Sequence, residues 1–177
     1  MKKLLVIGGS NNPQSINRTF ATYAASLVPG AEAMVLDLRN YSLPLYSPDL
    51  EKATGIPEAA KKFVAQIAAC DGIVISLAEY NGSYTPAFKN LFDWGTRHQP
   101  KIWAQKPMLL LSTSPGGRAA MDVRSAAKSR FPHLGGNIIA DFGLPSFQDN
   151  FKEGEGITDT LLAAELDVAV GKLVAAL

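Results

Sequence analysis

Short apolar runs alternate with helical patterns along most of this chain, which limits the folds that it can adopt. The runs are brief and rich in Val, Ile and Leu, as buried parallel strands are. Between them, apolar residues recur at spacings of three and four, the period of an amphipathic helix. We therefore expect a doubly wound α/β fold, a five-stranded parallel sheet with helices on both faces. The expected strands are 4–7, 33–38, 73–77, 108–111 and 137–140, and the five expected helices lie around 20–27, 60–67, 88–95, 123–130 and 162–173.

Length and composition indicate an ordinary globular protein. A chain of 177 residues fits one domain, so we expect 1–177 to fold as a single unit. Hydrophobic residues make up 47% and charged residues 19%, and no apolar run approaches the roughly 20 residues that span a bilayer. The net charge is +1, with both signs mixed along the chain. We expect no membrane insertion and no nucleic-acid partner.

The first residues and the single cysteine bear on the compartment. The opening stretch MKKLLVIGGSNN has an apolar run of only about five residues before two glycines, which favours a first strand over a signal peptide. Cys70 is the only cysteine, so the chain has no internal disulfide, and its place in a helical pattern is typical of a small buried residue. We therefore expect a cytoplasmic protein.

Segment 39–57 interrupts the alternation. It contains three prolines, two tyrosines and no helical period. We expect an ordered loop at the carboxyl edge of the sheet, which is either functional or a plain surface excursion. Pro57 is expected to be the first residue of the next helix, where its missing N–H costs no hydrogen bond.

Three polar loops follow expected strands: GGSNNPQSINR (8–18), AEYNGSYTP (78–86) and STSPGGR (112–118). In a parallel sheet, strand-to-helix loops emerge at the carboxyl edge, and ligands bind where the strand order reverses. With the order 2-1-3-4-5, strands one and three flank that reversal and strand four lies beside them. We therefore expect the three loops to line one crevice.

The first loop has the ingredients of a phosphate site. Gly8 and Gly9 allow a tight turn, and the hydroxyls and amides that follow can donate hydrogen bonds beside the N-terminus of a helix. The loop contains neither the nucleoside-triphosphatase motif nor the dinucleotide fingerprint, which leaves a phosphomonoester as the candidate ligand. The alternative is a capped turn, with Ser15 as the N-cap of the helix.

The other two loops indicate a planar ligand. Gly82 permits close approach of the backbone to a flat ring, Asn81 can donate to heteroatoms on its edge, and Tyr80 or Tyr84 can cover its face. The loop at 112–118 offers further N–H groups opposite. Together the three loops predict a ligand with a phosphate at one end and a planar ring with a polar edge at the other. Flavin mononucleotide (FMN) fits that description.

These three motifs, in this order and spacing, resemble the NADPH-dependent FMN reductase family of flavodoxin-like proteins, which includes quinone, azo-dye and chromate reductases. The likeness extends over about residues 3–140 and is most specific in AEYNGSYTPAFKNLFDW. It implies a flavodoxin-like fold and a ping-pong transfer of hydride from NADPH or NADH through bound FMN to a quinone-like or other small acceptor. The implied cofactor-binding residues are Ser10, Asn12, Ser15, Ile16, Asn17, Glu79, Tyr80, Asn81, Gly82, Ser114, Gly116 and Gly117.

Two positions depart from the family pattern. Many relatives have arginine where this chain has Asn12, and proline where it has Ala78. Loss of the arginine removes a charge-assisted contact to phosphate, unless Arg18 replaces it. Loss of the proline leaves the ring-binding loop less restricted.

No side chain is a convincing catalyst. His98 and His133 lie outside the three loops and are expected at the surface, and the helical register of Asp93 points it towards a helix neighbour or a subunit contact. The flavin itself would carry the chemistry, so no catalytic residue and no metal site are expected. The alternative function is a flavodoxin-like electron carrier or a flavin-binding module without reductase turnover.

The resemblance also implies a homodimer or homotetramer. Phe92, Trp94 and Trp103 are candidate contacts between subunits, although aromatic residues at helical spacing also fit a core position. Arg118 and Arg124 follow the third loop and have two interpretations. They could contact the 2′-phosphate of NADPH, or they could form an ordinary solvated helix face.

Overall fold

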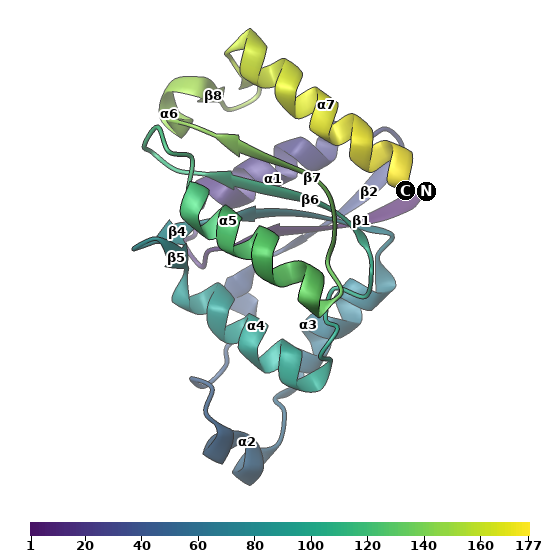
Figure 1. The fold of residues 1–177 in the computed structure, drawn as a ribbon, viewed down its shortest axis with the longest axis vertical. Coiled ribbons are helices and arrows are strands. Elements are labelled where there is room, and N and C mark those ends of the chain that lie inside the picture. The colour runs from purple at the N-terminus through teal and green to yellow at the C-terminus, as the bar shows by residue number, and fades with distance from the viewer.

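The computed structural model describes all residues 1–177, and its centre is a five-stranded parallel sheet (Figure 1). The strand order is β2-β1-β3-β6-β7, which is 2-1-3-4-5 when only the strands of this sheet are numbered. The predicted doubly wound, flavodoxin-like topology is therefore confirmed. The strands are β1 (Lys2–Gly8), β2 (Ala31–Leu36), β3 (Gly72–Leu77), β6 (Pro107–Thr113) and β7 (Asn137–Leu144).

Helices cover both faces of the sheet (Figure 1). On one face, α1 and α7 pack over a core of 18 buried residues, and on the other α3, α4 and α5 pack over a core of 22. Buried strands covered in this way explain the nearly continuous apolar runs in the sequence. The helices are α1 (Ile16–Ser26), α2 (Pro48–Thr54), α3 (Glu58–Ala69), α4 (Pro86–His98), α5 (Met121–Arg130), α6 (Phe147–Asn150) and α7 (Thr160–Ala176).

The starts of α1 and α4 are fixed by side chains of the sequence just before them. Ser15 is the N-cap of α1, and its Oγ accepts from the N–H of Arg18 at 3.2 Å, so the cap of the alternative interpretation is present. Thr85 caps α4 in the same way and donates from Oγ1 to the carbonyl of Gly9 at 2.8 Å. Thr85 therefore ties the loop before α4 to the loop after β1.

Segment 39–57 differs from the prediction of a loop without helix. It contains α2, preceded by a short 3₁₀ turn at Leu38–Asn40. No residue of α2 is buried, which is why no apolar stripe marked the helix in the sequence. The helix lies away from the sheet, below α4 in Figure 1, and Glu51 joins it to Arg97 of α4 with an N···O distance of 2.9 Å. Pro57 is the N-cap of α3 rather than its first residue.

Further short elements were not predicted. The hairpins β4–β5 (Glu79–Tyr80, Ser83–Tyr84) and β8–β9 (Phe151–Lys152, Gly156–Ile157), the helix α6 and a 3₁₀ turn at Phe131–Leu134 add to the five predicted strands and helices. The strand predicted at 137–140 continues to Leu144, and the strand predicted at 33–38 begins and ends two residues earlier. No helix combines the length and the apolar character needed to cross a membrane.

Candidate functional site

A cleft of about 310 Å³ opens at the carboxyl edge of the sheet, where the three predicted loops meet. The loop after β1, the loop after β3 and the loop after β6 all contribute to its walls, together with one residue of α6. The lining residues are Ser10, Asn12, Gln14, Ser15, Ile16, Asn17, Ala78, Glu79, Tyr80, Thr113, Ser114, Pro115 and Gln148. The predicted convergence of the loops is therefore present in the structure.

The loop after β1 wraps the N-terminus of α1. Asn12 shapes it: its N–H donates to Oγ of Ser10 at 3.1 Å, and its Oδ1 accepts from the N–H of Gln14 at 2.9 Å. The N–H groups of Ile16 and Asn17, in the first turn of α1, have no acceptor within the chain. Such N–H groups, at the positive end of a helix dipole, form a ready anion site.

Gly8 allows this loop to lie close to the sheet. A Cβ atom at Gly8 would lie 2.5 Å from the Cα of Arg18, so no larger residue fits without a backbone shift. Glycine is required at this position because β1 lies so close to the first turn of α1.

Asn17 anchors the start of α1 to two strands. Its Oδ1 accepts from the hydroxyl of Ser76 at 2.7 Å and from the N–H of Thr113 at 3.1 Å, and its Nδ2 donates to the carbonyl of Thr113 at 3.0 Å. All three residues are buried. We expected this side chain to contact phosphate; in the chain it is occupied by these three bonds.

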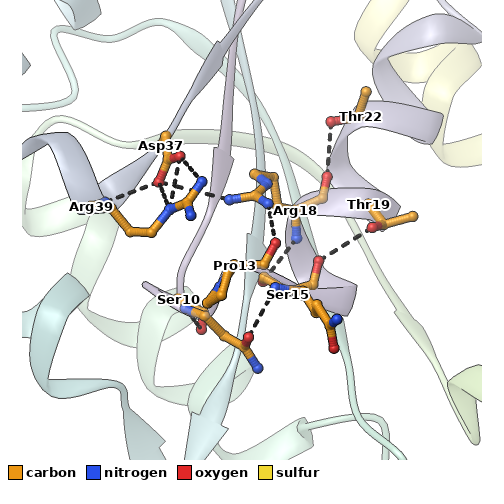
Figure 2. Close-up of polar contacts among 10 residues, drawn as sticks. Ser10, Pro13, Ser15, Arg18, Thr19, Thr22, Asp37 and Arg39 are labelled. Atoms are coloured by element: carbon orange, nitrogen blue, oxygen red, sulfur yellow. Dashed lines mark hydrogen bonds and ion pairs between the residues drawn. The ribbon is translucent and has the colours of Figure 1, made fainter.

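Arg18 lies behind the loop rather than in the cleft (Figure 2). Its Nη2 donates to the carbonyl of Pro13 at 2.5 Å, and its Nη1 lies 3.7 Å from Oδ1 of Asp37. Asp37 also accepts from Nε of Arg39 at 2.9 Å, and this bond, above all, lowers the pKa of Asp37 to about 2. Arg18 therefore braces the loop against the end of β2, and the cleft has no cationic side chain in its walls.

The loop after β3 is a two-residue hairpin, which explains its sequence. Asn81 and Gly82 join β4 to β5 with φ values of 52° and 73°. Positive φ at both central residues is what a type I′ turn requires, and Asn-Gly is its preferred sequence. Gly82 therefore serves the turn itself, and its close approach to a ligand stays a prediction.

Glu79 connects this hairpin to α5. Its Oε2 accepts from the N–H of Val123 at 2.9 Å, in the first turn of α5. The N-cap residue of α5, Ala120, has no side-chain hydrogen bond and a left-handed backbone with φ of 52°. Glu79 therefore supplies the capping carboxylate that the local sequence lacks.

Of the two tyrosines that were expected at a ligand ring, only Tyr80 lines the cleft, with 47% of its surface exposed. Tyr84 instead packs on Phe88, Phe92 and Phe131, with ring centroids 5.6, 6.2 and 6.4 Å away. Burial raises the pKa of Tyr84 to about 12. Tyr84 thus lies in the hairpin, partly buried, and packs its ring against the core.

The loop after β6 is held by the segment that follows β7. The N–H groups of Ser146 and Phe147 donate to the carbonyls of Gly116 and Ser114 at 3.1 and 3.0 Å. These bonds bring Gln148 to the cleft wall. No motif marked Gln148 in the sequence, since its position depends on contacts between two separate loops.

The structure brings together eight of the twelve predicted binding residues and leaves four outside the cleft wall. Those in the wall are Ser10, Asn12, Ser15, Ile16, Asn17, Glu79, Tyr80 and Ser114. The other four, Asn81, Gly82, Gly116 and Gly117, are exposed at the tips of the two neighbouring loops. Five further residues line the cleft and were not predicted to bind the cofactor: Gln14, Ala78, Thr113, Pro115 and Gln148.

Other titratable residues lie outside the cleft. His98 and His133 are exposed, and Asp93 pairs with Lys89 of the same helix at 2.8 Å. Cys70 is buried, and its burial raises the pKa of the thiol. No group of three or more His, Cys, Asp or Glu residues is arranged to bind a metal ion.

The aromatic residues that were candidates for subunit contacts are core residues. Trp94 and Trp103 are fully buried and Phe92 is 4% exposed. Nε1 of Trp94 donates to the carbonyl of Pro44 at 2.8 Å, because segment 39–57 folds over α4. Helical spacing in the sequence could not show this cover. Of the two interpretations offered for these aromatic residues, the core position is confirmed and the subunit contact is not.

Curated proteins with similar sequences are reductases. The chain is 37% identical to a 2-hydroxy-1,4-benzoquinone reductase from a Burkholderia species, over 64% of this chain and 61% of the relative. It is 36% identical to an NAD(P)H-dependent FMN reductase from Pseudomonas aeruginosa, over 64% of this chain and 60% of the relative. The chain thus spans less than two thirds of the length of both relatives.

Among solved structures, the flavoenzyme NAD(P)H:(acceptor) oxidoreductase FerB from Paracoccus denitrificans has the same fold, with a TM-score of 0.77 and 26% identity. The match covers 99% of this chain and 96% of that one. The profile of the NADPH-dependent FMN reductase family matches residues 2–149, which include every strand of the central sheet and every residue of the cleft wall. The chain belongs to the NADPH-dependent FMN reductase family.

Proposed function

We propose that the protein is an FMN-dependent NAD(P)H oxidoreductase that passes electrons to a quinone or another small acceptor. The observation that carries the proposal is the cleft at the topological switch point, whose wall combines the first turn of α1, with its free N–H groups, and the side chains of Tyr80 and Ser114. Family membership and relatives named as quinone and FMN reductases support it. Since the cleft is built on one sheet, we propose that residues 1–177 work as one domain.

The residues present fit FMN. The N–H groups of Ile16 and Asn17, with the hydroxyls of Ser10 and Ser15, would hold the phosphate, and the loop shaped by Asn12 would keep these donors in place. The exposed ring of Tyr80 would lie against the flavin ring.

The remaining residues would enclose the ring. Ser114 and Gln148 would border it on the opposite side, and Glu79 would fix the hairpin that carries Tyr80. Asn81, Gly82, Gly116 and Gly117, at the loop tips, would contact the part of the ligand that extends from the cleft. When bound, FMN would supply the chemistry of hydride and electron transfer between NADPH or NADH and the acceptor. The protein's share is binding, orientation and exclusion of water.

The decisive experiment is an anaerobic titration of the FMN-loaded protein with NADPH and then NADH, followed by a panel of quinones. Bleaching of the flavin bands by a pyridine nucleotide, and their recovery with a quinone, is the expected result. In double-reciprocal plots of the initial rate against the NAD(P)H concentration, parallel lines at several acceptor concentrations would support the ping-pong order. Turnover that does not depend on FMN would contradict the proposal.

We also propose a homodimer or homotetramer in the cytoplasm, where NAD(P)H is supplied. The support for association is membership of the family, whose resemblance implies it, and Leu45 at 82% and Leu161 at 74% are large apolar side chains exposed in the single chain. Sedimentation velocity at micromolar concentration tests the association, and a single monomeric species would contradict it.

Fractionation of the cells that produce the protein tests the proposed compartment, and recovery of the protein outside the cytoplasm would contradict that proposal.

A further inference from the structure

The turn that joins the loop after β6 to α5 has a strained backbone. Ala119 and Ala120 have φ values of 54° and 52°, in the left-handed region that residues with a Cβ atom rarely adopt. Only 6% and 2% of their surfaces are exposed. Two such residues in succession cost free energy, and they persist only where the surrounding structure fixes them. Such strain is typical of functional sites, and this turn directly follows the cleft loop that carries Ser114.

One buried hydroxyl closes the base of this loop. Ser112, near the end of β6, is fully buried, and its Oγ donates to the carbonyl of Ala119 at 2.5 Å. The bond joins the two ends of segment 113–118, three residues of which line the cleft. A serine hydroxyl has one hydrogen but two lone pairs, so its oxygen can accept a second hydrogen bond at the same time.

Arg124 supplies the donor for that second bond. Its Nη1 donates to Oγ of Ser112 at 3.1 Å, and its Nε lies 3.3 Å from Oδ2 of Asp141 in β7. A guanidinium can only donate, so it directs the hydroxyl hydrogen of Ser112 away from itself and towards Ala119. Only 18% of the Arg124 side chain is exposed, and it does not line the cleft, so it belongs neither to a solvated helix face nor to the cleft surface. Arg124 therefore supports the loop from behind.

Gly143 leaves space for the guanidinium. A Cβ atom at Gly143, in β7, would lie 1.6 Å from Nη1 of Arg124 and 2.7 Å from its Cζ. Any larger residue would therefore push the guanidinium out of its position and away from Ser112. The hydrogen bond from Arg124 to Ser112 thus depends on Gly143.

The same turn of α5 also holds a second wall of the cleft. The N–H of Val123 donates to Oε2 of Glu79 at 2.9 Å, and Glu79 begins the hairpin that carries Tyr80. Val123 and Arg124 are neighbours in α5. The first turn of the helix therefore fixes the hairpin through one residue and the loop after β6 through the next. The relative position of Tyr80 and Ser114 depends on both contacts.

We propose that Arg124 is a positioning residue of the cofactor site. It touches neither cofactor nor substrate; it orients the hydroxyl of Ser112, which holds the strained turn at Ala119, and so it sets the loop after β6 relative to Tyr80. Without the guanidinium, the hydroxyl of Ser112 is free to rotate and the turn relaxes, so the cleft is less well organised for its ligand. The inference rests on the proposed binding of FMN and adds to it a residue outside the cleft wall on which that binding depends.

The first test is FMN binding by Arg124→Ala, measured by fluorescence titration of the flavin-free protein. The dissociation constant should rise about tenfold, because the ligand must then order the loop. Arg124→Lys keeps the charge but lacks the planar fork that reaches Ser112 and Asp141 together, so its affinity should lie between those of Arg124→Ala and wild type. Lys128→Ala is the matched control, since Lys128 pairs with the same Asp141 at 2.7 Å but forms no hydrogen bond with Ser112. This control should bind FMN as wild type does.

The outcomes separate this inference from the proposed function. If wild type binds FMN and Arg124→Ala binds it equally well, the inference is wrong and the proposed function stands. If Lys128→Ala weakens binding as much as Arg124→Ala, the effect comes from Asp141 rather than from Ser112, and the inference is wrong as well. A wild-type protein that does not bind FMN overturns both.

The second test asks whether the neighbouring residues act through the same bond. Ser112→Ala should weaken FMN binding about as much as Arg124→Ala, and the double variant should bind no more weakly than either single variant. Gly143→Ala should weaken binding in wild type but much less in Arg124→Ala, where the guanidinium is absent. The next atom, Cβ of Ala119, lies 3.1 Å from the new Cβ. Effects that simply multiply in either double variant would overturn the proposed connection.

The third test separates positioning from stability. At a saturating FMN concentration, the visible circular dichroism of the bound flavin reports how the chain holds its ring. This spectrum should change in Arg124→Ala, and KM for NADPH should rise. Leu173→Ala is the control: Leu173 is buried in α7, which ends at the edge of the sheet opposite the cleft, so the variant lowers stability without moving the loops (Figure 1). If Arg124→Ala matches wild type in both measurements, Arg124 only stabilises the fold and the proposal is overturned.

Discussion

Asn17 and Thr113 are joined by two reciprocal hydrogen bonds, from the N–H of Thr113 to Oδ1 at 3.1 Å and from Nδ2 to the carbonyl of Thr113 at 3.0 Å. The pair fixes the first turn of α1, which follows β1, to the end of β6. Ser76 of β3 adds a third bond, at 2.7 Å. Two cleft loops that are almost 100 positions apart in the chain are thus held by one side chain.

Asn17→Ala should be strongly destabilising. It leaves the hydroxyl of Ser76 and both main-chain groups of Thr113 buried without a partner, which costs about 2–4 kcal/mol of the free energy of unfolding. Urea unfolding followed by circular dichroism measures the loss. Asn12→Ala is the control, since Asn12 is exposed and bonds only within its own loop. A loss below about 0.5 kcal/mol for Asn17→Ala, the range of neutral surface changes, would contradict the anchoring role.

Gly8→Ala should also lower the free energy of unfolding, because it separates β1 from the first turn of α1. The new Cβ would lie 2.5 Å from the Cα of Arg18, and backbone atoms can yield only if α1 moves away from β1. We expect a loss of about 2–3 kcal/mol, as for other overpacked sites. Gly117→Ala is the matched control, because a Cβ there meets nothing within 4 Å. Equal melting temperatures for the two variants would show that the close approach is not required.

Glu79→Ala should lower stability by about 1 kcal/mol, the usual worth of a helix cap. Its carboxylate is the acceptor for the N–H of Val123, and Ala120 offers α5 no side-chain cap. Glu79→Gln keeps an acceptor oxygen and should recover part of the lost stability. The difference between the two variants separates the contribution of the hydrogen bond from that of the charge. Hydrogen exchange of the Val123 amide gives the local readout, with faster exchange in Glu79→Ala than in Glu79→Gln. Unchanged exchange in both variants would contradict the capping role.

Asp37 should stabilise the fold only above strongly acidic pH. Its hydrogen bonds from Arg39 and its charge interaction with Arg18 lower its pKa from 3.8 to about 2. A lowered carboxyl pKa contributes stability that is complete above the unfolded value and is lost as the pH falls towards the folded value. The loss should therefore occur between about pH 5 and pH 2, and it should not exceed about 1 kcal/mol because solvent screens the pair. The free energy of unfolding of Asp37→Asn, measured by denaturant titration at several pH values, should not show this loss between pH 5 and pH 2. An identical pH profile for the variant and the wild type would contradict the prediction.

The main elements could be predicted from the sequence because burial leaves a periodic pattern. The strands of the sheet are covered on both faces, and Phe88, Leu91, Phe92 and Gly95 mark the inner face of α4. Helix α2 has no buried residue and so no stripe, but Ser47 before Pro48, with Gly55 at the end, was an available signal for it. Asn81-Gly82 was likewise an available hairpin signal.

Long-range contacts account for what the sequence could not show. Trp94 has the spacing of an outer helix face as well as that of a core, and only the fold of segment 39–57 decides between the two. Trp103 lies in the turn between α4 and β6, and its packing against Phe131 buries it. Arg18 looked available for a phosphate, but Asp37, which follows a different strand, directs it behind the loop. Such choices depend on neighbours far away in the chain and leave no local pattern.

Gln148 provides the test of a cleft residue that only the structure identified. It lines the wall from α6 and is exposed, so Gln148→Ala should leave the free energy of unfolding unchanged within about 0.5 kcal/mol. If the cleft binds FMN as proposed, loss of one neutral hydrogen bond should weaken binding by about two- to tenfold. Fluorescence titration of the flavin-free protein with FMN measures this change. Gln99→Ala, at the C-terminal end of α4 and outside the cleft wall, is the control and should bind FMN as wild type does. Equal affinities for both variants would place the ligand away from α6 and restrict the binding wall to the loops that follow β1, β3 and β6.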